Sequence, residues 1–276
     1  MNIKGSLNYP FSLDNQSMPA YFRVAAPPAL FAGFTLRSGG ASCGPFAAAN
    51  MGYGVGDEAA AVAKNRQALL TGAGGGRFSA LLTCRQVHGN RCKVITAEDL
   101  ADSEKLAETE ADALISAAPG ILLGILTADC LPLIILDKHA RAVAVVHAGW
   151  RGLEKGVAVA ALTEFKQSFA LPVSDLSVYA GPAIGACCFE VGGEVIERFH
   201  SLPELQGLSG WYRESASAYY LDLLAVQKRQ LVVAGLDPAN FHAVKVCTFC
   251  QDSCFSYRRD HAITGRQLAF AGIVKK

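Results

Sequence analysis

Three apolar segments follow one another in the middle of the chain, at residues 111–115, 120–136 and 142–147, and they restrict the fold more than any other feature. They are rich in the large and β-branched residues that buried strands favour. The longest segment contains Asp129 and Pro132, which a membrane-spanning helix would tolerate poorly. We therefore expect buried β-strands here, with residues 133–136 and 142–147 forming a hairpin.

Segments with helical character lie on both sides of this centre. Residues 58–70 and 157–169 are predicted helices, and residues 221–234 form the strongest amphipathic pattern, which Gly235 and Pro238 end. The other predicted strands are residues 29–36, 78–88, 93–96, 176–180 and 242–246. Strands occur in adjacent pairs more often than they alternate with helices. The expected fold is α+β, with mixed β-sheets packed together and flanked by helices.

Length and patterning favour a single domain. The chain has 276 residues, of which 51% are hydrophobic, so it can bury a large core. No linker or internal repeat divides it. Residues 1–28 show little periodicity and are predicted to form an irregular N-terminal arm, in which residues 20–24 are a candidate edge strand, with the domain over residues 29–276.

The charge balance narrows the classes of partner. Lys and Arg number 25 against 24 Asp and Glu, so the chain lacks the basic surface that nucleic acids require. Small-molecule substrates are therefore expected, with neither nucleic acid nor membrane as a partner. The first residues lack an apolar signal segment, so we expect a cytoplasmic protein. The nine cysteines are expected to be reduced thiols, because a chain of this length needs no disulfides to fold.

His88, Cys130 and His147 each stand at the end of an apolar, strand-like segment. Two imidazoles and one thiolate are zinc ligands, and a site with three protein ligands keeps one position for water or a substrate oxygen. Gln86 and Asp129 beside them are candidates for hydrogen bonds to the ligands. The set predicts a catalytic zinc centre. Taken singly, however, such a cysteine is more often a small core residue, and such a histidine is more often only hydrogen-bonded.

Other cysteines and arginines carry weaker signals. Cys247 and Cys250 have the C-x-x-C spacing of zinc sites and redox pairs, with Cys254 four residues on, but no second C-x-x-C follows, which favours ordinary thiols. Cys187 and Cys188 are neighbours, whose side chains would point to opposite faces of a strand. The arginines that are candidates for binding an oxyanion such as phosphate are Arg37, Arg151, Arg258 and Arg259.

The segments around these residues resemble the laccase-domain, or polyphenol oxidoreductase, family. They are Gln86-Val87-His88-Gly89, Ala128-Asp129-Cys130-Leu131-Pro132 and His147-Ala148-Gly149-Trp150-Arg151-Gly152. The resemblance continues through residues 35–40, 50–66, 181–191 and 247–266, and covers about residues 30–272 in order. Phe189 departs from the family pattern where a tyrosine is common, and Cys254 departs where an aromatic residue is expected.

The resemblance implies a fold of two packed sheets, related to cysteine-hydrolase-like toxin domains, and zinc held by His88, Cys130 and His147. It also implies phosphorolysis of adenosine, inosine and 5'-methylthioadenosine to the free base and a (thio)ribose 1-phosphate, with adenosine deamination as a side activity. In this hypothesis the purine nucleoside and phosphate are the substrates. The residues expected to act on them are Arg37, Asp129 and Cys130 as catalytic residues, with Asn50, Gln86 and Arg258 as substrate-binding residues.

Three alternatives use the same side chains. A cytoplasmic cysteine hydrolase, or an enzyme that edits peptidoglycan precursors, would use Cys130 as nucleophile and His147 as base. A copper-dependent polyphenol oxidase matches the older family label, but six histidines are too few for several copper centres. A zinc-stabilised interaction module would bind metal without catalysis. The sequence predicts no oligomeric state.

Overall fold

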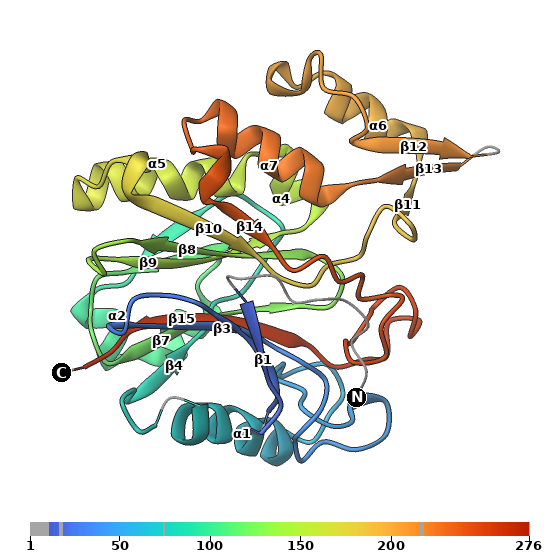
Figure 1. Ribbon diagram of the computed structural model, residues 1–276. Helices are drawn as coiled ribbons and strands as arrows, with labels where there is room; N and C mark the ends of the chain where they lie inside the picture. Colours follow the sequence, from blue (N-terminus) through green and yellow to red (C-terminus); the bar gives the residue numbers. More distant parts are fainter. Residues whose placement is uncertain (1–10, 17–18, 74, 216–217, 276) are drawn as a thin grey trace.

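The computed structural model describes residues 11–16, 19–73, 75–215 and 218–275, and two six-stranded β-sheets form its centre (Figure 1). The strands of the first sheet, in order across it, are β1 (Phe11–Asp14), β2 (Tyr21–Val24), β3 (Leu30–Thr35), β15 (Gln267–Ile273), β7 (Ile121–Thr127) and β4 (Ala80–Leu82). Those of the second are β14 (Phe241–Ala243), β10 (Leu176–Ala180), β8 (Leu131–Asp137), β9 (Val143–Ala148), β6 (Ala113–Ser116) and β5 (Cys92–Val94). A small third sheet has the order β11 (Glu190–Val191), β13 (Ala218–Leu221) and β12 (Tyr212–Ser215).

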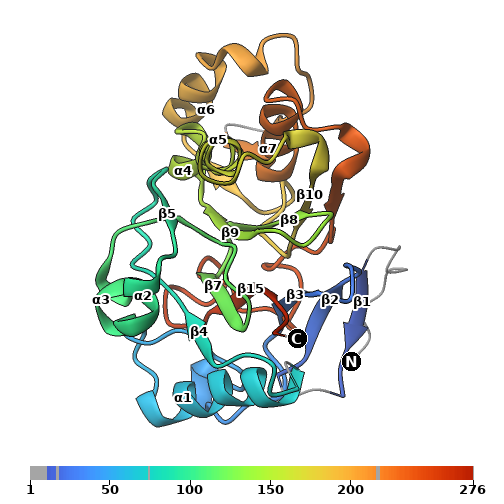
Figure 2. The same ribbon diagram turned by 90° about the vertical axis from the view of Figure 1, so that its left-hand side faces the viewer.

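Helices cover the outer faces of the two large sheets. The α-helices are α1 (Ala59–Ala68), α2 (Ala97–Ala101), α3 (Ser103–Glu108), α4 (Trp150–Glu154), α5 (Val157–Phe169), α6 (Gly193–His200) and α7 (Leu223–Val233). Helices α4, α5 and α7 lie over the second sheet, and α1 lies on the far side of the first (Figures 1 and 2). Both large sheets contain parallel and antiparallel pairs. The predicted α+β architecture of mixed, packed sheets in a single domain is therefore confirmed.

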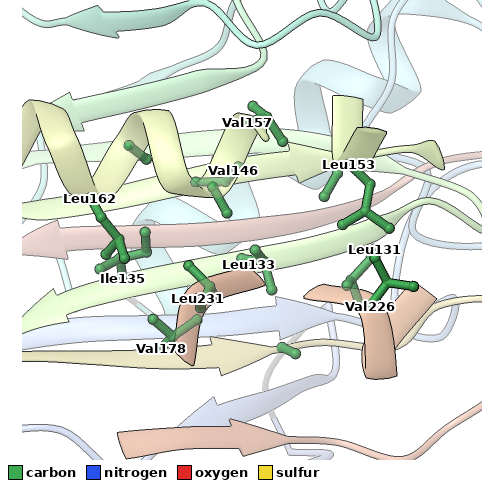
Figure 3. Close-up of a cluster of buried hydrophobic side chains, with 14 of the residues drawn as sticks. Leu131, Leu133, Ile135, Val146, Leu153, Val157, Leu162, Val178, Val226 and Leu231 are labelled. Carbon is green, nitrogen blue, oxygen red and sulfur yellow. The ribbon is translucent and has the colours of Figure 1, made fainter. Parts of the chain in front are cut away.

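The apolar strands of the centre are buried on both faces. In β8, Leu133 and Ile135 pack in the cluster that includes α5 and α7 (Figure 3). Ile134 and Leu136 pack in the other cluster, between the two sheets. Successive side chains of a strand point to opposite faces, so a strand that is apolar throughout must be covered on both sides. Each such side chain stabilises the fold by about 1.5–3 kcal/mol relative to an exposed position.

Helix α5 begins and ends where the sequence predicts. Its buried residues include Val157, Ala161, Leu162 and Phe165, which recur at helical spacing and face the second sheet. Ala170 follows in the left-handed conformation and ends the helix. Helix α7 likewise falls within the predicted residues 221–234.

Other predictions need correction. The predicted strand over residues 78–88 is too long, because only β4, which ends at Leu82, is a strand there. His88 at the other end of the predicted segment has a φ of 57°, which a strand does not contain. Strand β15 is not among the predicted strands, although it forms the middle of the first sheet. Strand β2 falls within the candidate edge strand at residues 20–24, whereas β1 was not predicted, and both extend that sheet by antiparallel pairing. The domain boundary at residue 28 stays a prediction, and residues 1–10 and 17–18 of the arm lie outside the described residues.

Among the described residues, no helix has the length and apolar character needed to cross a membrane. This agrees with the expectation that residues 120–136 form strands, which they do in β7 and β8.

A buried carboxylate holds the turn between β8 and β9. Asp137 accepts hydrogen bonds from the backbone N–H groups of His139 and Arg141, at 3.2 and 2.9 Å, and two from the Arg141 guanidinium, at 2.9 and 2.7 Å. Burial alone would raise the pKa of the Asp137 carboxyl, but the hydrogen bonds and charge of Arg141 hold this pKa below its ordinary value. The ionised carboxylate therefore stabilises the hairpin.

We expect Asp137→Asn to lower the free energy of unfolding by about 1–3 kcal/mol at pH 7, because it weakens a charge-assisted network. A group with a lowered folded-state pKa contributes its stability above the unfolded pKa and loses it as the pH falls through the folded pKa. The difference between variant and wild type should therefore shrink below about pH 4. Urea unfolding at several pH values measures it. Asp252→Asn, at an exposed position, is the control, and equal effects of both changes at pH 7 would contradict the prediction.

Candidate functional site

Cys130 and His147 lie close together because of how the strands of the two large sheets are connected and paired. Strand β7 belongs to the first sheet and β8 to the second, and Cys130 lies in the connection between them. Strand β9 pairs antiparallel with β8 so that Pro132 faces His147 and Leu131 faces Ala148. This register brings the Cys130 thiol beside the His147 imidazole.

Asp112 positions the two histidines. Its carboxylate accepts hydrogen bonds from the backbone N–H groups of Val87, His88 and Gly89, at 3.2, 3.0 and 2.7 Å. The same carboxylate lies 2.8 Å from Nδ1 of His147, which leaves Nε2 of that ring for another partner. One buried side chain therefore fixes both the loop that carries His88 and the orientation of His147.

The three side chains form a candidate metal site. One ligand atom from each of His88, Cys130 and His147 lies within 4.8 Å of the others, and Nε2 of His88 is 3.8 Å from Sγ of Cys130. The two imidazole rings are nearly perpendicular, with centroids 4.7 Å apart. The predicted convergence of these residues is thus present in the structure.

The thiol and the buried imidazole stabilise each other's charge. Burial alone would raise the pKa of the Cys130 thiol, but the charge of His147 and hydrogen bonds with His147 and His88 lower it to about 6. Burial alone would lower the pKa of His147, but Cys130 and Asp112 raise it to about 9. The site therefore favours a thiolate near neutral pH, which is the form that binds a metal or acts as a nucleophile.

Gly149 allows the three side chains to approach. A Cβ atom at this position would lie 2.7 Å from Cδ2 of His88 and 3.0 Å from Sγ of Cys130. Both atoms belong to candidate metal ligands, so moving either one away would change the site. Glycine is therefore a steric requirement of the cluster.

The cluster opens into a cavity of about 640 Å³, a volume typical of small-molecule sites. Its aromatic lining residues are Tyr53, Trp150, Phe189 and Tyr257, and its guanidinium groups belong to Arg151, Arg258 and Arg266. The guanidinium carbon of Arg151 lies 4.3 Å from the ring centre of Trp150. The guanidinium carbon of Arg258 lies 5.6 Å from the ring centre of Phe189. The cavity can therefore hold a flat ring and an anion together.

Gln86, Asp129 and Arg258 line this cavity, as the sequence analysis expects of site residues. The Gln86 amide makes two 2.8 Å hydrogen bonds with the backbone of Leu126, so its position is fixed. One Asp129 oxygen accepts a 2.6 Å hydrogen bond from the Thr248 hydroxyl, and the other accepts a 2.7 Å hydrogen bond from the backbone N–H of Arg258. Both Asp129 oxygens are thus used to join loops.

Arg37 and Asn50 are not among the residues that line the cavity. The Arg37 guanidinium donates to the carbonyl of Ala47 at 2.6 Å and lies 4.0 Å from Asp260. The buried Asn50 amide bonds to Gly52 and accepts the N–H of Arg266 at 2.8 Å. Asn50 therefore does not line the cavity but holds two segments that do, the loop that carries Tyr53 and the backbone of Arg266.

Neither Asp112 nor Arg266 is among the site residues predicted from the sequence. Asp112 interrupts an apolar segment as the one charged residue of Ala111-Asp112-Ala113-Leu114-Ile115, and a buried charge requires partners. Arg266 precedes the unpredicted strand β15, so its place in the fold had no local signal. Arg151 was identified as a candidate for binding an oxyanion, and it does line the cavity.

We expect Gly149→Ala to weaken metal binding at least about tenfold, as losing a group that orients a ligand does. The new methyl group would displace the His88 ring or the Cys130 thiol. Competition with a chromogenic zinc chelator measures the affinity. Gly193→Ala is the matched control, because its Cβ would lie 3.5 Å from the Tyr219 ring, an ordinary contact. Equal affinities of the two folded variants would contradict the steric argument.

Comparison with known proteins shows which family the chain resembles. The model of the multi-copper polyphenol oxidoreductase laccase family matches residues 31–274. Purine nucleoside phosphorylase YlmD of Geobacillus stearothermophilus is 34% identical over 263 residues, which cover 93% of this chain and 96% of that protein. Purine nucleoside phosphorylase YfiH of Escherichia coli is 33% identical over 249 residues, with 90% and 96% covered. The crystal structure of the hypothetical protein YfiH of Bacillus licheniformis matches with a TM-score of 0.88 at 30% identity, covering 96% of this chain and 100% of that one. The chain belongs to the multi-copper polyphenol oxidoreductase laccase family.

Proposed function

We propose that this protein is a zinc-dependent purine nucleoside phosphorylase. Its proposed substrates are adenosine, inosine and 5'-methylthioadenosine, each with phosphate, and its products are the free base and (thio)ribose 1-phosphate. Two relatives similar over nearly their whole length bear the name purine nucleoside phosphorylase. The observation that carries the proposal is a cavity that combines aromatic rings, guanidinium groups and the candidate metal site.

The donor set fits zinc. Zinc accepts imidazole nitrogen and thiolate sulfur, and the lowered pKa of Cys130 supplies the thiolate form near neutral pH. Asp112 on Nδ1 of His147 is the partner that metal-bound histidines usually have. When bound, zinc supplies a Lewis acid that polarises an oxygen or activates water.

In this proposal the chain binds the nucleoside and phosphate side by side. The base stacks on the aromatic lining, for which Trp150 and Phe189 are candidates, and Arg151, Arg258 and Arg266 bind phosphate. A phosphate oxygen attacks the anomeric carbon of the sugar as the glycosidic bond breaks. The bonding electrons stay with the purine, which takes up a proton, and the guanidinium groups stabilise the charge on phosphate.

We propose different roles for two residues from those expected from the sequence. Arg37 contacts Ala47 and Asp260, so we propose that it supports the loop behind the cavity instead of binding phosphate. Asp129 uses both oxygens to hold Thr248 and Arg258, so we propose a positioning role for it instead of proton transfer. We retain adenosine deamination as a proposed side activity.

Chromatography of the products tests the function directly. Protein of measured metal content is incubated with inosine, adenosine or methylthioadenosine, with and without phosphate. We expect hypoxanthine from inosine only when phosphate is present, and inosine from adenosine without phosphate. Cys130→Ala and His147→Ala should bind less zinc and release no base while remaining folded. Base release that is independent of phosphate would contradict phosphorolysis.

Chelation separates the main alternatives. The thiolate and imidazolium of Cys130 and His147 also suit a cysteine hydrolase, whose activity would persist after the metal is removed. The proposed phosphorylase should lose base release on chelation and regain it with zinc. A copper-loaded protein that oxidises phenols and leaves nucleosides intact would instead support the oxidase.

Arginine variants test where phosphate binds. We expect Arg258→Ala and Arg266→Ala each to lower kcat/KM for phosphate by about 10- to 100-fold, the equivalent of one lost hydrogen bond to a charged group. Steady-state kinetics with varied phosphate measure this effect. Arg23→Ala on β2 is the control, since Arg23 is not among the residues that line the cavity. A larger loss in Arg37→Ala than in both cavity variants would restore the first assignment.

A further inference from the structure

A second group of thiols lies outside the proposed active site. The sulfur atoms of four cysteines all lie within 4.8 Å of one another: Cys187, Cys188, Cys247 and Cys250. The Cys250 sulfur is 3.8 Å from that of Cys187 and 3.3 Å from that of Cys188. In a tetrahedral zinc site with Zn–S bonds of about 2.3 Å, neighbouring sulfurs lie about 3.8 Å apart. We propose that these four cysteines bind a second zinc ion, which has a structural role.

The local backbone explains how two adjacent cysteines contribute to one site. In a strand, the side chains of Cys187 and Cys188 would point to opposite faces. In the structure they lie in a turn before β11, in which the N–H of Cys188 bonds to the carbonyl of Gly185 at 2.9 Å. Both sulfurs therefore face the C-x-x-C pair, for which the sequence favours ordinary thiols because no second C-x-x-C follows.

Backbone N–H groups hold the Cys247 sulfur in place within the group. The N–H of Gly185 donates to this sulfur at 3.2 Å, and the backbone of Cys250 provides a second bond to it. Cys254 is not a member of the group and is buried, so a closed set of four ligands is complete without it.

Two arginines hold the loops that carry the four cysteines. Arg213 on β12 donates to the carbonyls of Ala186 and Cys187, at 3.0 and 3.2 Å. Arg259 donates to the carbonyls of Thr248, Phe249 and Gln251 in the other loop, at 2.8, 3.3 and 3.1 Å. These hydrogen bonds hold each loop separately.

The second ion would join two walls of the active-site cavity. Phe189, which follows Cys188, lines the cavity, and the carbonyl of the next residue, Glu190, accepts the Arg258 guanidinium at 3.1 Å. Thr248, which follows Cys247, bonds to Asp129 beside the first metal site. A zinc site with four cysteine ligands has no open position, so the ion has no catalytic role and instead fixes the distance between these loops.

Metal analysis of variants tests this inference independently of the catalytic proposal. We expect wild-type protein, purified under reducing conditions, to contain two zinc ions per chain. The double variant Cys187→Ser with Cys250→Ser should contain half as much, and so should Cys130→Ser, which keeps the second site. Cys43→Ser, at another exposed cysteine, should match wild type. Wild-type zinc content in the double variant would overturn the proposal, whether or not nucleosides are cleaved.

Thiol labelling of unmutated protein gives a second measurement that does not depend on the folding of a variant. Cys187 and Cys250 are exposed, so without metal an alkylating reagent should reach them as readily as Cys43. We expect both to be protected at least about tenfold in the zinc-loaded protein, since ligation removes the free thiolate, and chelation should abolish this protection. Equal labelling before and after chelation, or a disulfide between two of the four in mass spectra of protein prepared under reducing conditions, would overturn the proposal.

Discussion

The geometry of the candidate metal site depends on the hydrogen bonds of the Asp112 carboxylate. This carboxylate accepts three successive backbone N–H groups from residues 87–89 and also holds Nδ1 of His147. Removing one partner of a buried charged network leaves the others unsatisfied, which costs more than the net contribution of a single hydrogen bond. The same contacts keep the pKa of Asp112 below its ordinary value despite burial, so the carboxylate stays ionised and acts on both histidines.

The arrangement of the sheets explains why such a site forms where it does. Strands β7 and β8 follow one another in sequence but belong to different sheets, so their connection crosses from one core layer to the other. Cys130 lies on this connection, and its neighbour Asp129 adopts a φ of 89°, in the left-handed region that aspartate tolerates. The geometry of the site is therefore linked to the packing of the two sheets, and a shift between the layers would separate the ligands.

The sequence predicted elements whose signal is local and missed those that depend on distant contacts. Helix α5 and the β8–β9 hairpin carry clear patterns and were predicted well. Strand β15 was missed, although it is buried along its length and pairs with β3 and β7, because those partners are distant in sequence. The candidate ligands His88, Cys130 and His147 were identified from residue type, whereas Arg266 and the contacts of Arg37 required the fold.

The second histidine helps to decide between a metal site and a cysteine nucleophile. A thiolate nucleophile needs one imidazole as its base, and His147, oriented by Asp112, already meets that need. His88 nevertheless lies 3.8 Å from the same sulfur and is held in the left-handed conformation by the same carboxylate. A non-glycine residue in that conformation costs free energy, and structures keep such strain where a side chain must be held in one place. A second imidazole fixed beside one thiolate serves as a ligand more naturally than as a base, which favours the metal over the nucleophile.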